Sequence, residues 1–121
     1  MITQANVLKN EIAEWLIILT GLEKQNVAMK IRISLAVQNT LNRDFVDLAE
    51  YFQQLFINYD QMIRLLRHDI QDFLIQIGGA EELPDTCIPR QHFDSLKNEM
   101  MKSVFEFNKT RISIDDLLSF N

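Results

Sequence analysis

Glycine and proline are scarce in this chain, with three Gly and two Pro among 121 residues. β-Strands need turn residues at intervals of roughly 8–12 residues, whereas long helices need few. The shortage argues against a fold of many short strands and favours a few long helices. We therefore expect an all-α fold, and the length is typical of a single domain covering residues 1–121.

Cysteine is also nearly absent. The only one is Cys87, which excludes an internal disulfide and a cysteine-based zinc site and fits a reducing compartment. No export signal is visible, and the longest purely apolar run, Trp15 to Leu19, is far too short to span a bilayer. The sequence thus predicts a soluble, cytoplasmic protein without membrane insertion.

A clustered positive charge is missing as well. The formal net charge is −5, and the basic residues are scattered among acidic ones. Binding to nucleic acid depends on clustered Lys and Arg that displace counterions from the phosphates. We expect no nucleic-acid partner, and we interpret the charged positions as solvated helix faces.

Apolar residues at alternating spacings of four and three predict a first helix over about 4–39. The seam is Leu8, Ile12, Trp15, Leu19, Leu22, Asn26, Met29, Ile33, Ala36 and Thr40. It keeps its register across Gly21, which favours one continuous helix. A break at Thr20-Gly21 is the alternative.

A tight turn should follow, with Asn42 as a left-handed residue and Asp44 as the N-cap of a second helix over about 44–77. The second seam is Phe45, Leu48, Phe52, Leu55, Tyr59, Met62, Leu66, Ile70, Phe73 and Ile77. These two helices predict a long antiparallel hairpin, packed as in a coiled coil.

A connecting loop over 78–89 should lead to a shorter third helix over about 90–109, followed by a tail, 112–121, with a possible short helical turn. At 1.5 Å per residue the hairpin spans about 50 Å and the third helix about 30 Å. About 20 Å of hairpin core would then be uncovered, which a second copy could bury. We therefore predict a homodimer or a helical protein partner.

Asn26 interrupts the first seam, and a lone buried Asn can set register and partner number in helical assemblies. The alternative is that it faces solvent. We predict an interface at Asn26 together with Trp15, Leu19, Leu22, Phe52, Leu55 and Tyr59.

The segment RHDI contains His68, with Asp69 next to it and Arg64 and Asp72 one turn to either side. It resembles the phosphoacceptor box of some sensor histidine kinases, which implies a phosphotransfer or dimerisation module with His68 as phosphoacceptor. No glycine-rich ATP-binding segment follows, so a separate kinase would be needed. The alternatives for His68 are a solvated, helix-paired residue and an interface contact.

Other chemistry is not indicated. The Glu-x-x-His pairs of di-metal helical bundles are absent, as are catalytic triads and phosphate loops, so we expect no metal, no cofactor and no enzyme activity. His68 with Asp72 would make only a weak metal site. Cys87 fits either a small apolar plug or a thiol activated near a helix start.

The C-terminal stretch SIDDLLSFN is acidic and rich in Leu and Phe. It could dock into the groove of a partner, or it could fold back onto its own bundle. The residues concerned are Asp115, Asp116, Leu117, Leu118 and Phe120. The leading hypothesis from the sequence is a non-catalytic helical interaction or scaffold module that self-associates.

Overall fold

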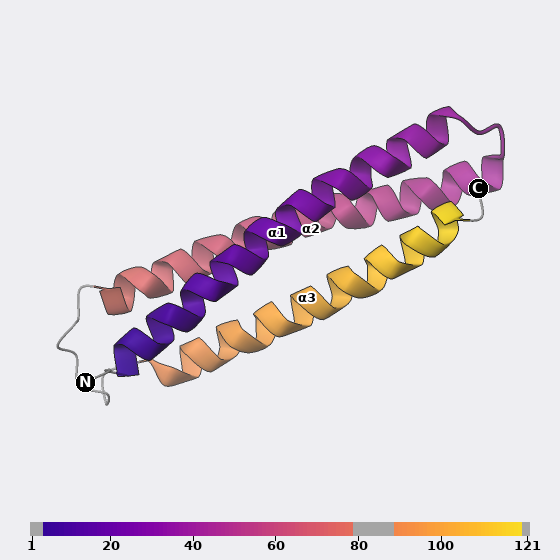
Figure 1. The fold of residues 1–121 in the computed structure, drawn as a ribbon. Coiled ribbons are helices and arrows are strands. Elements are labelled where there is room, and N and C mark those ends of the chain that lie inside the picture. The colour runs from indigo at the N-terminus through magenta and orange to yellow at the C-terminus, as the bar shows by residue number, and fades with distance from the viewer. Residues whose placement is uncertain (1–3, 79–88, 120–121) are drawn as a thin grey trace.

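Three long helices form the described part of the chain. The computed structural model describes residues 4–78 and 89–119, and there it contains α1 (Gln4–Gln38), α2 (Arg43–Gly78) and α3 (Arg90–Ser119), with no strand. The helices run up, down and up, so α1 and α3 are parallel (Figure 1). The predicted all-α bundle, built on a long hairpin, is confirmed.

The first helix passes through Gly21 without a break. A methyl group added at Gly21 would meet no atom within 4 Å, so no neighbouring segment requires a glycine here. An interior helix glycine costs about 1 kcal/mol relative to Ala. The buried face of α1 offsets this cost, and the alternative with two shorter helices does not apply.

The turn between α1 and α2 differs from the prediction in its cap. Asn42, not Asp44, is the N-cap, because its Oδ1 accepts a hydrogen bond from the Phe45 amide at 3.2 Å. No non-glycine residue in the described ranges has a positive φ, so Asn42 is not left-handed. Asp44 lies in the first turn of α2, where its negative charge interacts favourably with the positive end of the helix dipole.

The core contains two groups of aromatic rings. Near the start of α3, Trp15 stacks on Phe93 with ring centroids 5.1 Å apart, and Phe73 lies 5.9 Å from the same Phe93 ring. Farther along the bundle, Phe56 and Tyr59 of α2 pack edge-on against Phe107 at 5.9 and 5.4 Å. Each group joins α3 to the hairpin, so the third helix is part of the same core.

The buried stripe of α2 is wider than the predicted seam. Ala49, Phe56 and Ile63 are buried although the predicted seam does not include them, whereas Leu48 is 43% exposed. A helix that packs between two neighbours buries a broader stripe than a two-stranded coiled coil does. The predicted core position of Leu48 is therefore wrong, and Ala49 occupies the core at this level instead.

The third helix continues to Ser119, ten residues beyond the predicted end at 109. Thr110 and Ser113 bond back to the carbonyls of Glu106 and Lys109 at 3.1 Å, as these residue types can within a helix. At 1.5 Å per residue α3 is about 45 Å long and runs along most of the hairpin. The uncovered 20 Å of core, and the argument for a second copy drawn from it, do not apply.

Some predicted features lie outside the described residues. They are residues 79–88 of the predicted connection, which include Cys87, and Phe120 at the end of the predicted tail. Within the described ranges, none of the three helices has the length and apolar character needed to cross a membrane.

Candidate interaction surface

The predicted interface residues lie inside the chain's own bundle. Trp15, Leu19 and Leu22 are buried in the shared core of the three helices, and Phe52 is half-buried against it. The others on α2 are half-buried Leu55 and Tyr59, whose hydroxyl contacts Thr110 Oγ1 of α3 at 2.8 Å. Trp15, Leu19 and Leu22 therefore pack within the monomer.

Asn26 is fully buried and links α1 to α2. Its Nδ2 donates to the Phe56 carbonyl at 2.9 Å and to Asp60 Oδ1, and Asp60 Oδ2 also pairs with Lys30 Nζ. Asn26 Oδ1 finds no hydrogen-bond partner among the described residues. Sliding the hairpin by one turn would leave the amide without acceptors, at a cost of about 1–3 kcal/mol. These contacts of Asn26 favour the observed register of α1 against α2.

His68 lies on the side of α2 away from the core, with 71% of its side chain exposed. Its Nδ1 is 3.7 Å from Asp69 Oδ1 and 3.6 Å from Asp72 Oδ2. Arg64 lines a separate small cavity and makes no ion pair within the described ranges. The imidazole is thus accessible, but both carboxylates beside it would repel an incoming phosphoryl group.

The predicted tail is folded into α3. Ile114 is fully buried, and Leu117 and Leu118 pack against the core. Asp115 Oδ1 accepts from Arg32 Nη1 of α1 at 2.5 Å, while Asp116 is exposed. Of the two alternatives for these residues, the contacts fit the one in which they cover their own bundle.

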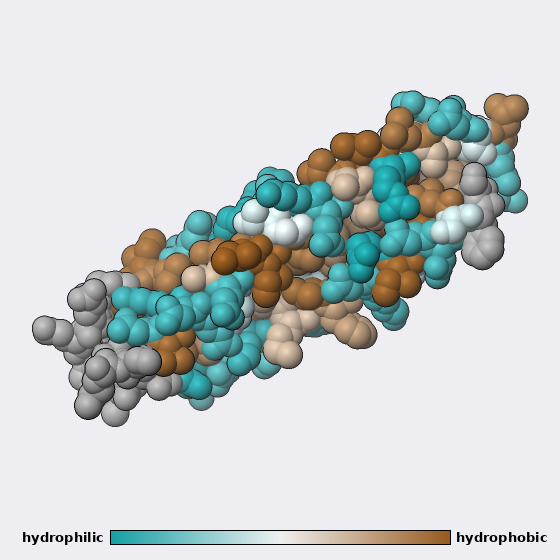
Figure 2. Space-filling model, viewed as in Figure 1, coloured by the Kyte–Doolittle hydropathy of each residue, from teal (hydrophilic) through white to brown (hydrophobic). Residues whose placement is uncertain are grey.

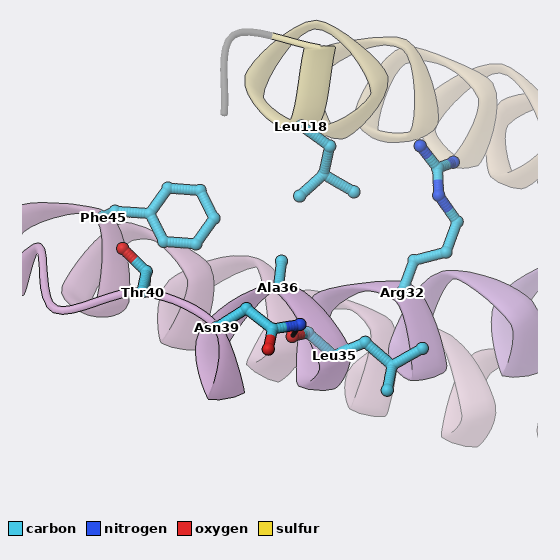
Figure 3. Close-up of a pocket in the computed structure, with 7 residues that line it drawn as sticks. All are labelled: Arg32, Leu35, Ala36, Asn39, Thr40, Phe45 and Leu118. Atoms are coloured by element: carbon cyan, nitrogen blue, oxygen red, sulfur yellow. Dashed lines mark hydrogen bonds between the residues drawn. The ribbon is translucent and has the colours of Figure 1, made fainter.

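A cavity of about 370 Å³ lies beside the α1–α2 turn. Figure 3 shows Leu118 of α3 above Ala36, with Phe45 on one side of the cavity and Arg32 on the other. Arg32 is already paired with Asp115, so an anionic ligand would have to displace that carboxylate. In the described ranges no group of three His, Cys, Asp or Glu side chains is placed to hold a metal ion.

The most unusual surface is the outward side of α1. A second row of residues with 3-4 spacing runs along it, and none of its members is buried. We call it the outer seam: Val7, Asn10, Glu14, Ile17, Gly21, Lys24, Ala28 and Ile31. The side chain of Ile17 is 72% exposed and that of Ile31 55% exposed.

The outward side of α2 also carries exposed apolar residues. Its row opposite the core is Gln54, Asn58, Gln61, Leu65, His68, Asp72 and Ile75. Leu65 and Ile75 of this row are 65% and 76% exposed. Scattered exposed apolar residues are normal, so the outer seam of α1 is distinguished by the apolar flank of α3 that lies beside it.

The third helix widens the apolar surface of α1. Lys97 and Asp115 of α3 pair with Glu11 and Arg32 of α1, so this flank of α3 faces α1. Met101, Phe105 and Ile112 lie between Lys97 and Asp115 at helical spacing and are 62%, 69% and 54% exposed. Figure 2 shows apolar side chains interrupting the polar surface along α1 and over α3.

Comparisons of the chain with protein-family models, with curated proteins and with solved structures found no match. The candidate surface therefore depends on geometry alone. Reasoning from the sequence missed the outer seam, because the apolar row through Leu8 and Ile12 was the stronger of the two rows on the same helix. The signal was present in Ile17, Gly21, Ala28 and Ile31, which follow one another at spacings of four, seven and three residues.

Proposed function

We propose that this chain is a non-catalytic helical interaction module whose contact surface is the outer seam of α1. The observation that carries the proposal is that Ile17 and Ile31 are 72% and 55% exposed on one row of a helix whose other side packs in the core. An amphipathic surface helix normally shows one apolar stripe. Exposed apolar residues on the opposite side of the same helix lower solubility. A helical partner that covers them would explain their presence.

The expected partner is another helix, because a straight row with 3-4 spacing matches the knobs and holes of helix packing. Self-association is the simplest form of such contact. The single cysteine fits a reducing compartment, and the cytoplasm is the proposed location.

The test compares two exposed isoleucines of nearly equal exposure, Ile17 at 72% and Ile75 at 76%. We expect Ile17→Glu to abolish concentration-dependent association in light scattering and Ile75→Glu to leave it unchanged. Both variants should keep the helical circular dichroism of the wild type, since neither side chain is buried. If the wild type associates, equal behaviour of the two variants would refute the role of the outer seam.

A second candidate function, of a different class, is phosphotransfer at His68, and it rests on the 71% exposure of that side chain. Incubation with histidine kinases and phosphate mapping in the wild type and in His68→Gln tests it. Acid-labile phosphate at position 68 would support it, and its absence with every kinase tried would count against it.

A further inference from the structure

We propose that two copies of this chain pair through their outer seams, antiparallel about a two-fold axis, with Ile17 of each copy over Gly21 of the other and Glu14 against Lys24. This inference rests on the proposed function, since it takes the same seam as the contact surface. It adds that the helix covering the seam belongs to a second copy of the chain, and it specifies how the two helices are aligned.

The spacing of the seam allows an antiparallel pair, and its two charged residues select the register. In an antiparallel two-fold pair, residue numbers that face each other have a constant sum. The steps along the outer seam are 3, 4, 3, 4, 3, 4 and 3, which read the same in both directions. The same row continues to Leu35 and Gln38, so this spacing allows several antiparallel registers. The register that places Glu14 opposite Lys24 is centred on residue 19, with the following facing pairs: Val7 and Ile31, Asn10 and Ala28, Glu14 and Lys24, Ile17 and Gly21.

Charge complementarity selects the antiparallel direction. Four charged residues of α1 already form ion pairs with α2 or α3: Glu11, Glu23, Lys30 and Arg32. Glu14 and Lys24 are exposed and have no ion pair or hydrogen bond within the described ranges. The antiparallel register places each Glu14 opposite a Lys24, twice in the dimer. A parallel pair would instead oppose two like charges at each level.

Gly21 supplies the space that the contact needs. Its α-carbon faces open space, so the fold of one chain gives no reason for a glycine. A glycine on a helix surface lets another backbone or a large side chain approach closely. Ile17, which stands one turn away on the same seam, is the side chain that the two-fold operation brings to that position.

The size of the contact predicts a weak dimer. From residue 7 to residue 31 the seam is roughly 36 Å long, and a helix is about 10–12 Å wide. The contact then covers on the order of 400 Å² per copy, about half of the 800 Å² in a standard interface. Met101 and Phe105 on the adjoining flank of α3 add apolar area. We therefore expect association in the micromolar range or weaker.

The decisive experiment is a charge swap followed by sedimentation equilibrium. Glu14→Lys and Lys24→Glu should each weaken the dimer roughly 10- to 30-fold, because two attractive contacts become repulsive. The double variant should return to within about threefold of wild type, and an equimolar mixture of the two single variants should form the heterodimer equally well. A double variant as weak as the single ones would overturn the proposal.

Cross-linking tests the register independently, in chains that carry Cys87→Ser. Ile17→Cys mixed with Gly21→Cys should form a mixed disulfide faster than Ile17→Cys mixed with Leu35→Cys. Leu35 is a matched site because it lies on the same helix and is 53% exposed. Preferred cross-linking to position 35 would overturn this register.

The two proposals fail in different ways. A wild type that dimerises, loses the dimer in Ile17→Glu and does not respond to the charge swap refutes only the antiparallel arrangement. A wild type that is monomeric at millimolar concentration refutes this inference, and the outer seam then requires a different helical partner. Indifference of association to Ile17→Glu refutes the proposed function itself.

Discussion

Replacing Ile114 with Ala should destabilise the protein strongly, although this residue lies in a segment that resembles a docking tail in sequence. Ile114 is fully buried in the last turns of α3. The substitution removes three carbon atoms, each worth about 0.8 kcal/mol when buried. The cavity left behind adds to the loss, and the higher helix propensity of Ala reduces it by about 0.4 kcal/mol. We expect a net loss of about 2–4 kcal/mol.

The matched control is Ile112→Ala, two residues earlier on the same helix at 54% exposure. It should change stability by no more than about 0.5 kcal/mol. With a urea m-value of about 1–3 kcal/mol/M, the Ile114 variant should unfold roughly 1–2 M earlier than the control. The assay is urea unfolding followed by far-ultraviolet circular dichroism at low protein concentration. Equal midpoints for the two variants would refute the packing of these last turns.

Three further predictions concern local contacts. Gly21→Ala should raise the melting temperature by about 2–5 °C at concentrations where the chain is monomeric, because no atom opposes the added methyl group; a lower value would contradict this. Asn42→Ala should cost about 0.5–2 kcal/mol in urea unfolding through loss of the N-cap, while Asn42→Asp should retain most of it. Asp60→Ala should cost about 1–3 kcal/mol by removing an acceptor from buried Asn26, against a near-zero effect of Asp72→Ala in the same assay.

The hairpin was predictable because its apolar periodicity is strong and breakers are few. Leu66, Ile70, Phe73 and Ile77 are all buried, as their spacing predicts. The continuity of α1 through Gly21 was also predictable, since the first seam, which includes Leu19 and Leu22, keeps its register there. In these segments local propensity and tertiary packing favour the same structure.

The end of α3 was harder to predict. Arg111 occupies the seam position between Phe107 and Ile114, so the apolar pattern breaks although the helix does not. In the structure Arg111 is only partly exposed and its Nη1 lies 3.8 Å from Asp115 Oδ2, one turn later. A long side chain can cover apolar surface with its stem while its charged end reaches solvent. Residue type alone does not reveal this.

The interface could not be assigned from the sequence for a general reason. Trp15 and Leu22 would show the same spacing whether they faced α2 of their own chain or a second copy, because burial leaves the same periodicity in either case. Only the placement of α3 shows that the first seam of α1 packs within the chain and that the outer seam is open. The Asn26 contact with Asp60 likewise required the paired helix to be in place.

The stacking of Trp15 on Phe93 has a spectroscopic consequence. Trp15 is the only tryptophan, and it lies at the end of the bundle where α3 begins, far from the α1–α2 turn. Its fluorescence reports the local state of that end, whereas circular dichroism sums all three helices. Denaturation curves that coincide for the two signals would show that the rod melts as one unit. Curves that separate would show whether the end of the bundle that contains Trp15 and Phe93 unfolds before or after the rest.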